Sequence, residues 1–307
     1  VHGEFQWING KKIYICGGAW FFFNFWTTNR GKRPDFRLEA LEFFWMWYLY
    51  IEKTPSVTGL LVVKCRRIGD SEKALCIMYE RVTRYFNYPG GMQSYTDEEA
   101  KKAFERIVRA YKKMPFFFKP KTSGTLSEEM KFHRPSEVVT VKKLKESRGE
   151  VIENSDGEFL DSSISYRATV NLAYDGQILG HFTLDECLKI PFYKLNVRSQ
   201  WDNIRRVLTL NNGMTTVGRA LLLSTVEEKS ENDPDNSTVE MAEQLWDDSD
   251  PNRLDGNGQT KTGLVRLFRG YEKNAQIDEF GFPKIEEARR HRQNRIDSLL
   301  RDKNYSE

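Results

Sequence analysis

Residues 59–84 combine an apolar run, a basic loop and an amphipathic segment without a break. The apolar run, residues 59–63, is rich in leucine and valine and predicts a strand buried on both faces, as in a parallel sheet. Residues 71–84 carry apolar side chains three or four positions apart, which predicts a helix. The loop between them, residues 64–70, is basic and contains a glycine. Because a helix N-terminus and the amide groups before it attract anions, this order predicts a phosphate-binding unit.

The rest of the chain continues the alternation of strands and helices, which indicates an α/β fold with a mostly parallel central sheet flanked by helices. One helix is marked by Thr96 as its cap, with Glu99 three residues on. Further helices are predicted at residues 37–51, 97–113 and 285–300, and further strands at residues 178–184 and 220–223. The acidic, turn-rich residues 227–237 predict a loop.

Composition narrows the class of protein. The 307 residues are 39% hydrophobic and 13% aromatic, which indicates a folded chain, and the net charge of +3 excludes a histone-like protein while leaving a DNA partner open. The four cysteines are far apart, which disfavours a disulfide scaffold or a structural zinc site and favours a reducing compartment. The most apolar run, residues 13–26, is too short for a bilayer that needs about 20 residues, and we see no signal peptide, so we expect neither membrane insertion nor secretion.

The chain divides into three predicted parts. Residues 1–58 form an aromatic-rich lead-in packed on the core, residues 59–280 form the α/β domain with a polar insertion near residues 115–162, and residues 281–307 form a charged helix or linker. Clustered aromatic side chains in the lead-in favour a packed core. A base-stacking platform is the alternative interpretation.

The basic loop resembles the Walker A pattern G-x-x-x-x-G-K-[ST] only in part. Gly69 and Ser71 match, whereas Lys64 replaces the first glycine and Asp70 replaces the usual lysine. From the strand end, Lys64 can reach across the loop to β- and γ-phosphates, and the Asp70 carboxylate, which would repel them, is expected to point away. The predicted phosphate-binding loop is Lys64, Cys65, Arg66, Arg67, Ile68, Gly69, Asp70 and Ser71. The competing interpretation is a basic strand-to-helix turn.

Two later strands end in polar residues. Asp185 and Glu186 follow a strand-like run, as in a Walker B element, where the first acid holds Mg²⁺ and the second polarises the attacking water. Ser224 and Thr225 follow the apolar run at residues 220–223, where small hydroxyl residues could sense a γ-phosphate. Most acidic pairs in proteins are solvated surface residues, which is the alternative interpretation of Asp185 and Glu186. For Ser224 and Thr225, an ordinary strand end followed by a turn is an equally good interpretation.

The order of these motifs resembles the large terminase subunit of tailed double-stranded DNA bacteriophages, some of which carry the Walker A lysine at the start of the loop. The resemblance rests on Lys64-x-x-Arg67-x-Gly69-x-Ser71, on Tyr174-Asp175-Gly176 before Leu184-Asp185-Glu186, on Leu223-Ser224-Thr225-Val226-Glu227-Glu228, and on residues 34–37, 245–250 and 262–264. It covers most of the chain.

The resemblance implies a RecA-like P-loop NTPase of the additional-strand class that hydrolyses ATP to drive double-stranded DNA through the portal protein into a procapsid. It assigns phosphate contact to Lys64, Mg²⁺ to Ser71 with Asp185, and catalysis to Glu186. Transition-state charge would be stabilised by Arg66 or Arg67, and hydrolysis would be coupled to movement by Ser224 and Thr225. The acidic residues 230–235 depart from the family, whose members tend to be glycine-rich there.

The resemblance also implies partners and a location. These are a small terminase subunit, a homo-oligomeric ring on the portal, and the host cytoplasm during infection. We expect no nuclease activity, because no set of acids can be assigned to the nuclease domain that normally follows in the family. The alternatives are another P-loop enzyme, such as a helicase-like nucleic-acid translocase or a kinase, and a non-enzymatic interaction protein, in which Lys64 and Glu186 would be ordinary surface charges.

Overall fold

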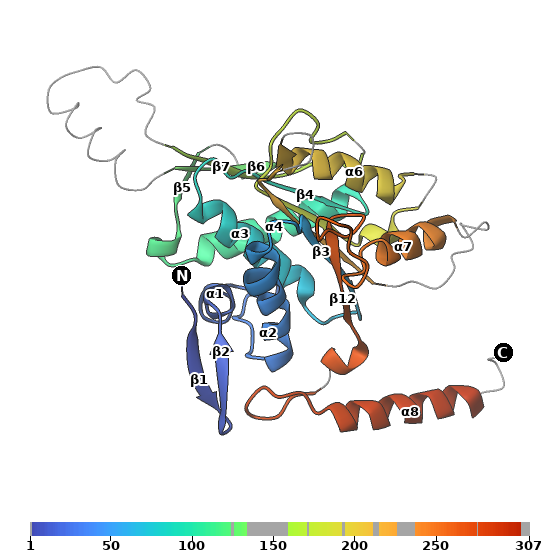
Figure 1. Cartoon of the computed structure of the whole chain (residues 1–307). Helices are drawn as coiled ribbons and strands as arrows, with labels where there is room; N and C mark the ends of the chain where they lie inside the picture. Colours follow the sequence, from blue (N-terminus) through green and yellow to red (C-terminus); the bar gives the residue numbers. More distant parts are fainter. Residues whose placement is uncertain are drawn as a thin grey trace, which may run out of the picture.

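An eight-stranded sheet forms the centre of the computed structural model (Figure 1). The structure describes residues 2–123, 126–133, 159–170, 172–191, 194–210, 215–225, 237–274 and 276–301. The strand order is β12-β3-β11-β8-β4-β7-β6-β5, parallel from β12 to β7 and antiparallel at β6 and β5. The strands are β3 (Gly59–Lys64), β4 (Gly90–Ser94), β5 (Lys121–Ser123), β6 (Glu129–His133), β7 (Phe159–Tyr166), β8 (His181–Asp185), β11 (Arg219–Ser224) and β12 (Leu264–Arg269). The predicted α/β fold with a mostly parallel sheet is therefore confirmed.

Helices cover both faces of this sheet (Figure 1). They are α1 (Gly17–Phe25), α2 (Leu38–Trp45), α3 (Asp70–Arg84), α4 (Asp97–Lys113), α6 (Val197–Val207) and α7 (Ser237–Asp247). Helix α8 (Ile285–Arg301) lies away from the sheet and is largely exposed (Figure 1). Two short hairpins lie outside the main sheet, β1 (Glu4–Ile8) with β2 (Lys11–Ile15) and β9 (Thr209–Leu210) with β10 (Thr215–Thr216). In the described ranges, no helix is long and apolar enough to cross a membrane.

Alternation along the strands divides the core into two layers. In β3, Leu60 and Val62 pack with α1 to α4 on one face, while Leu61 packs with α6 and α7 on the other. In β11, Leu221 and Leu223 pack on the face covered by α1 to α4, and Leu222 packs on the face covered by α6 and α7. Successive side chains of a strand point to opposite faces, so an apolar run without alternation is what a sheet covered on both sides requires.

The aromatic lead-in is largely core. Trp26 and Trp47 are fully buried, and the Phe21 ring stacks on Tyr79 of α3 with centroids 6.3 Å apart. The Trp26 indole N–H also donates to the Glu72 carboxylate at 3.2 Å. These contacts join the segment before β3 to the helix after it, which supports the packed-core interpretation over a stacking platform.

Several element boundaries differ from the sequence predictions. The helix expected at residues 37–51 is α2 followed by a π-helical turn at Met46–Tyr50 and a 3₁₀ turn at Ile51–Lys53, so the segment is helical throughout but changes its hydrogen-bond spacing. The strand expected at residues 178–184 begins only at His181. The predicted helix at residues 97–113 is confirmed, with Thr96 Oγ1 accepting from the Glu99 amide at 3.2 Å.

The polar insertion is partly β structure. Within residues 115–162, strands β5 and β6 pair antiparallel and extend the main sheet beyond β7. Residues 134–158 lie outside the described residues, as do residues 226–236, which include most of the predicted acidic loop.

Candidate functional site

The carboxyl ends of three parallel strands meet at one edge of the sheet. Strand β11 lies between β3 and β8, with Ser224 opposite Val63 and Leu223 opposite Asp185. Parallel strands in register present their last residues side by side, so Lys64, Asp185 and the residue after Ser224 share this edge. A chemical site assembled here would draw on segments more than 150 positions apart in the chain.

Lys64 and Glu186 form an ion pair across β11. The Lys64 ammonium lies 3.1 Å from Glu186 Oε1, and both side chains are largely buried. The other carboxylate oxygen, Oε2, accepts from the amide and hydroxyl of Thr225 at 3.2 and 3.0 Å and lies 3.3 Å from the Lys189 ammonium. Burial raises the pKa of Glu186, but the attraction of Lys64 and Lys189 outweighs it and leaves the pKa below its ordinary value. The carboxylate is therefore ionised at neutral pH.

Ser71 and Asp185 form the second pair. The Ser71 hydroxyl, in the first turn of α3, donates to Asp185 Oδ1 at 3.0 Å. Burial raises the pKa of Asp185, Lys64 opposes the shift, and Glu186 adds to it. The main chain of Asp185 is also fixed, because Ser94 donates its hydroxyl to the Asp185 carbonyl at 3.1 Å.

This hydroxyl–carboxylate pair has the donor chemistry of a magnesium site. Mg²⁺ prefers oxygen ligands and commonly takes only one or two carboxylates, with phosphate and water completing its shell. Over the described ranges, no three His, Cys, Asp or Glu side chains gather into a group that could hold a metal by itself. Ser71 and Asp185 therefore suit a cation shared with a phosphate group.

The predicted phosphate-binding loop, residues 64–71, contains two residues in the left-handed region. Gly69 has φ of 84° and precedes α3, and Arg67 has φ of 66°. A glycine adopts this conformation without the steric cost that a side chain carries. The Cys65 amide donates to the Arg269 carbonyl of β12 at 2.9 Å, so it is committed to the sheet edge and cannot also cradle a phosphate. The side chains of Arg66 and Arg67 are exposed.

Asp70 is turned into the protein. Its carboxylate oxygens lie 2.7 Å from the Lys73 ammonium and 2.8 Å from Arg269 Nε, and the Asp70 and Arg269 side chains are fully buried. Lys73 also donates to the Ile68 carbonyl at 3.2 Å. Burial lowers the pKa of Lys73, and Asp70 opposes that shift. The carboxylate that stands in the usual lysine position thus neutralises two buried cations, rather than serving only the start of α3.

The two hydroxyl residues after β11 contact the segment that follows β8. Thr225 binds Glu186 directly, as described above. The Ser224 hydroxyl accepts from the Leu188 amide at 3.1 Å, in the 3₁₀ turn Cys187–Lys189. Both residues therefore lie where they can transmit a displacement of Glu186.

Three partners were not predicted from the sequence. Lys189 stands three positions after Glu186, a spacing that places it beside the carboxylate only if a 3₁₀ turn forms. Lys73 stands three positions after Asp70 in a predicted helix, so this pair could have been found. Arg269 comes from the edge strand β12, and no local pattern points to it.

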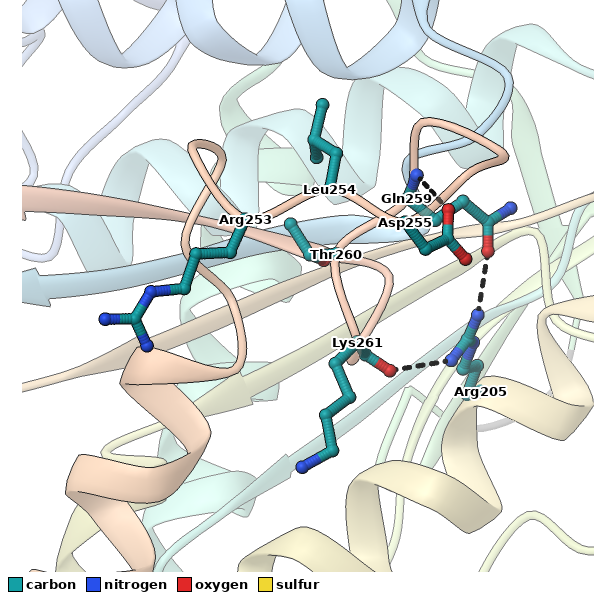
Figure 2. A pocket seen from close by; sticks show the side chains of 7 residues that line it. All are labelled: Arg205, Arg253, Leu254, Asp255, Gln259, Thr260 and Lys261. Carbon is teal, nitrogen blue, oxygen red and sulfur yellow. Dashed lines mark hydrogen bonds between the residues drawn. The ribbon is translucent and has the colours of Figure 1, made fainter.

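A separate cavity of about 570 Å³ lies beside the loop before β12 (Figure 2). Figure 2 shows Arg205 of α6 pointing at Gln259 and at the carbonyl of Lys261, to which it donates at 3.3 and 3.5 Å. Asp255 accepts from the amide of Gln259 at 2.9 Å. The polar groups of this cavity bond largely to one another and brace the loop, and none of the predicted site residues lines it.

Comparisons with known proteins point to one kind of fold. No protein-family model and no curated protein matches the sequence. The ATPase domain of the large terminase from Thermus phage P74-26 is similar in structure, with a TM-score of 0.51, 15% identity, and coverage of 88% of this chain and 90% of that domain. The large terminase of bacteriophage HK97 gives a TM-score of 0.52 and 13% identity over 92% of this chain and 52% of that one, so this chain spans about half its length.

These likenesses and the strand order define a P-loop NTPase fold with an additional strand, β11, between the phosphate-loop strand and the acidic strand. Within that class, the chain has the fold of the ATPase domain of phage large terminases, as the sequence motifs had predicted.

Proposed function

We propose that this chain is an ATP-hydrolysing motor that moves double-stranded DNA into a viral procapsid. The observation that carries the proposal is the pairing of Lys64 with Glu186, 3.1 Å apart, at the strand ends of a terminase-like ATPase fold. A cation for phosphate and a carboxylate for water, at one edge of a sheet, are the groups that phosphoryl transfer to water needs.

Most of the predicted residues have a role in this proposal. Lys64 would bind the β- and γ-phosphates, and contact with them would draw its ammonium away from Glu186. Glu186, ionised because its pKa is lowered, would then accept the proton of the attacking water. Arg66 or Arg67 would offset charge in the transition state. Thr225 would report the rearrangement of Glu186 to the end of β11.

The nucleotide would be ATP with Mg²⁺. Ser71 and Asp185 would hold the ion, which neutralises charge on the phosphate oxygens when bound. Ile68, Gly69 and Asp70 would contribute their main-chain amides at the start of α3, whereas the Cys65 amide stays bonded to the Arg269 carbonyl.

The proposal extends to partners that the terminase-like fold suggests. These are double-stranded DNA, a portal protein and procapsid, a small terminase subunit and further copies of this chain in a ring. The expected location is the host cytoplasm during infection.

A helicase-like translocase is the alternative function, and it would use the same site. The form of DNA that stimulates ATP hydrolysis distinguishes a helicase-like translocase from a packaging motor, because a packaging motor should respond to duplex rather than single-stranded DNA.

ATP hydrolysis by the full chain, measured with and without duplex DNA, tests the proposal. Lys64→Ala should lower kcat by about 10²–10³-fold, the usual effect of removing one preorganised electrostatic donor. Glu186→Gln should bind nucleotide nearly as the parent does and stop turnover. The controls are Lys131→Ala and Glu129→Gln, an exposed lysine–glutamate pair 3.5 Å apart on β6, distant from β3 and β8 in the sheet. If both site variants hydrolyse ATP like the controls, the assignment fails.

A further inference from the structure

A cavity of about 670 Å³ lies between the phosphate loop and α8. One wall is formed by Cys65 and Arg66 of the loop, and another by His291 and Arg292 of α8. Tyr271, two positions after the end of β12, completes it. The volume lies within the range of about 300–1,000 Å³ that is typical of small-molecule sites. A ligand whose phosphates sat on the loop would find this space directly beside it.

The lining suits a planar, polar ring system. The Arg292 guanidinium lies over the Tyr271 ring, 4.4 Å from its centroid, and the His291 side chain adds another flat group. Nucleobases stack on aromatic rings and on guanidinium planes. Gln276 and Asn294 add amide groups, each of which can donate and accept at the edge of a base.

The cavity also has the charge of a nucleotide site. Four of its lining residues are arginines, and one is a glutamate. The strand connection explains why it adjoins the loop: the Cys65 amide donates to the Arg269 carbonyl at 2.9 Å, so the chain leaving β12 starts beside the loop and reaches Tyr271 within two residues. Positive charge next to the phosphate position favours an anion, and the planar groups favour a base attached to it.

We infer that this cavity holds the base and ribose of the nucleotide whose phosphates occupy the loop, with the base stacking on Tyr271, whose ring is backed on one face by Arg292, and with Asn294 bonding to the edge of the base. The inference rests on the proposed function and names the part of the same site that selects a nucleoside. Arginines on α8 also suit DNA phosphates, but an open basic surface suffices for a duplex backbone. A cavity that adds an aromatic ring and two amides fits a nucleoside better.

Equilibrium binding of two probes to the full chain tests the inference. One probe is a non-hydrolysable ATP analogue and the other is tripolyphosphate, each with Mg²⁺. Tyr271→Ala should weaken binding of the analogue about tenfold, the loss of one stacking contact, and leave tripolyphosphate binding unchanged. Tyr271→Phe keeps the ring and should bind both probes like the parent. Asn294→Ala should weaken only the analogue. The matched control is Arg289→Ala, on α8 but outside the cavity lining.

The outcomes separate this inference from the proposed function. If Lys64→Ala weakens both probes while Tyr271→Ala and Asn294→Ala change neither, the phosphate site stands and the nucleoside cavity is overturned. Equal weakening of both probes by Tyr271→Ala would also overturn it, because the effect would then pass through the loop. If Tyr271→Ala and Arg292→Ala weaken binding of duplex DNA and leave binding of the ATP analogue unchanged, these residues bind DNA and the nucleoside cavity is overturned. A parent chain that binds neither probe contradicts both the inference and the proposed function. Thermal melts confirm that each variant is folded.

Discussion

The Nε atom of Arg269 lies 2.8 Å from Oδ2 of Asp70, and both side chains are fully buried. With Lys73 on the other carboxylate oxygen, one buried anion holds two buried cations at the start of α3. Arg269 further donates to the Glu39 carbonyl at 2.9 Å, which ties α2 to the same cluster. These buried charges thus fix the start of α3, next to the predicted phosphate-binding loop.

Asp70 substitutions should therefore act on stability. Asp70→Asn removes the anion beside Lys73 and leaves Arg269 only the Glu42 carboxylate, 3.6 Å from its Nη1. It should lower the free energy of unfolding by about 3–5 kcal/mol, as measured by denaturant unfolding. Asp70→Lys restores the usual Walker residue but buries a third cation, so we expect an unfolded or strongly destabilised chain rather than tighter nucleotide binding. A stable Asp70→Lys variant with higher ATP affinity would show that this side chain can turn toward the ligand.

Thr225 should control turnover more than binding. Its hydroxyl donates to Glu186 Oε2 at 3.0 Å, so Thr225→Val removes one of the bonds that orient the carboxylate. We expect kcat to fall about tenfold, equivalent to about 1.4 kcal/mol in the barrier, with nucleotide affinity unchanged. Thr225→Ser keeps the hydroxyl and should restore most of the rate. Equal loss in the serine and valine variants would show that keeping the hydroxyl does not keep the rate, and would contradict this role of the hydrogen bond.

His181 should make folding sensitive to acid. Its ring is fully buried edge-on to Trp47, with centroids 5.2 Å apart, and burial lowers its pKa to about 3. An unfolded histidine titrates near about 6.5, so between these values the unfolded chain binds more protons and stability falls as pH falls. From pH 7.5 to pH 5 the loss from this one group should be about 2 kcal/mol.

The test compares denaturant unfolding of the parent and His181→Leu at both pH values. The variant should lose about 2 kcal/mol less than the parent on acidification, whatever its stability at neutral pH. The difference isolates His181 from the carboxyl groups, several of which titrate at lower pH. Parallel pH dependence in the two proteins would contradict the assignment.

DNA binding by the chain alone should be weak and electrostatic. The net charge is only +3, so few phosphates can be neutralised, and affinity for duplex DNA should drop at least about tenfold between roughly 50 and 200 mM salt. Fluorescence anisotropy with a labelled duplex measures this directly. Binding that persists at high salt would indicate base stacking rather than phosphate contact.

The sequence predicted the parts of the fold that local pattern encodes. Residues 59–63 had to be a doubly buried strand because every position is apolar, and the loop chemistry then placed α3 after it. It could not predict that Glu186 would adopt φ of 56° and turn the chain so that Lys189 returns to the carboxylate. It also could not pair Asp70 with Arg269, because that contact depends on which strand occupies the sheet edge next to β3.

The contact between Arg269 and the carbonyl of Glu39 spans 230 positions. During synthesis, α3 and its loop emerge long before β12, and until β12 arrives the Asp70 carboxylate has Lys73 of the same helix as a partner but lacks Arg269. The loop before α3 should therefore reach its native conformation only after the ribosome has released β12. A fragment that ends before Arg269 should accordingly leave this loop incompletely folded.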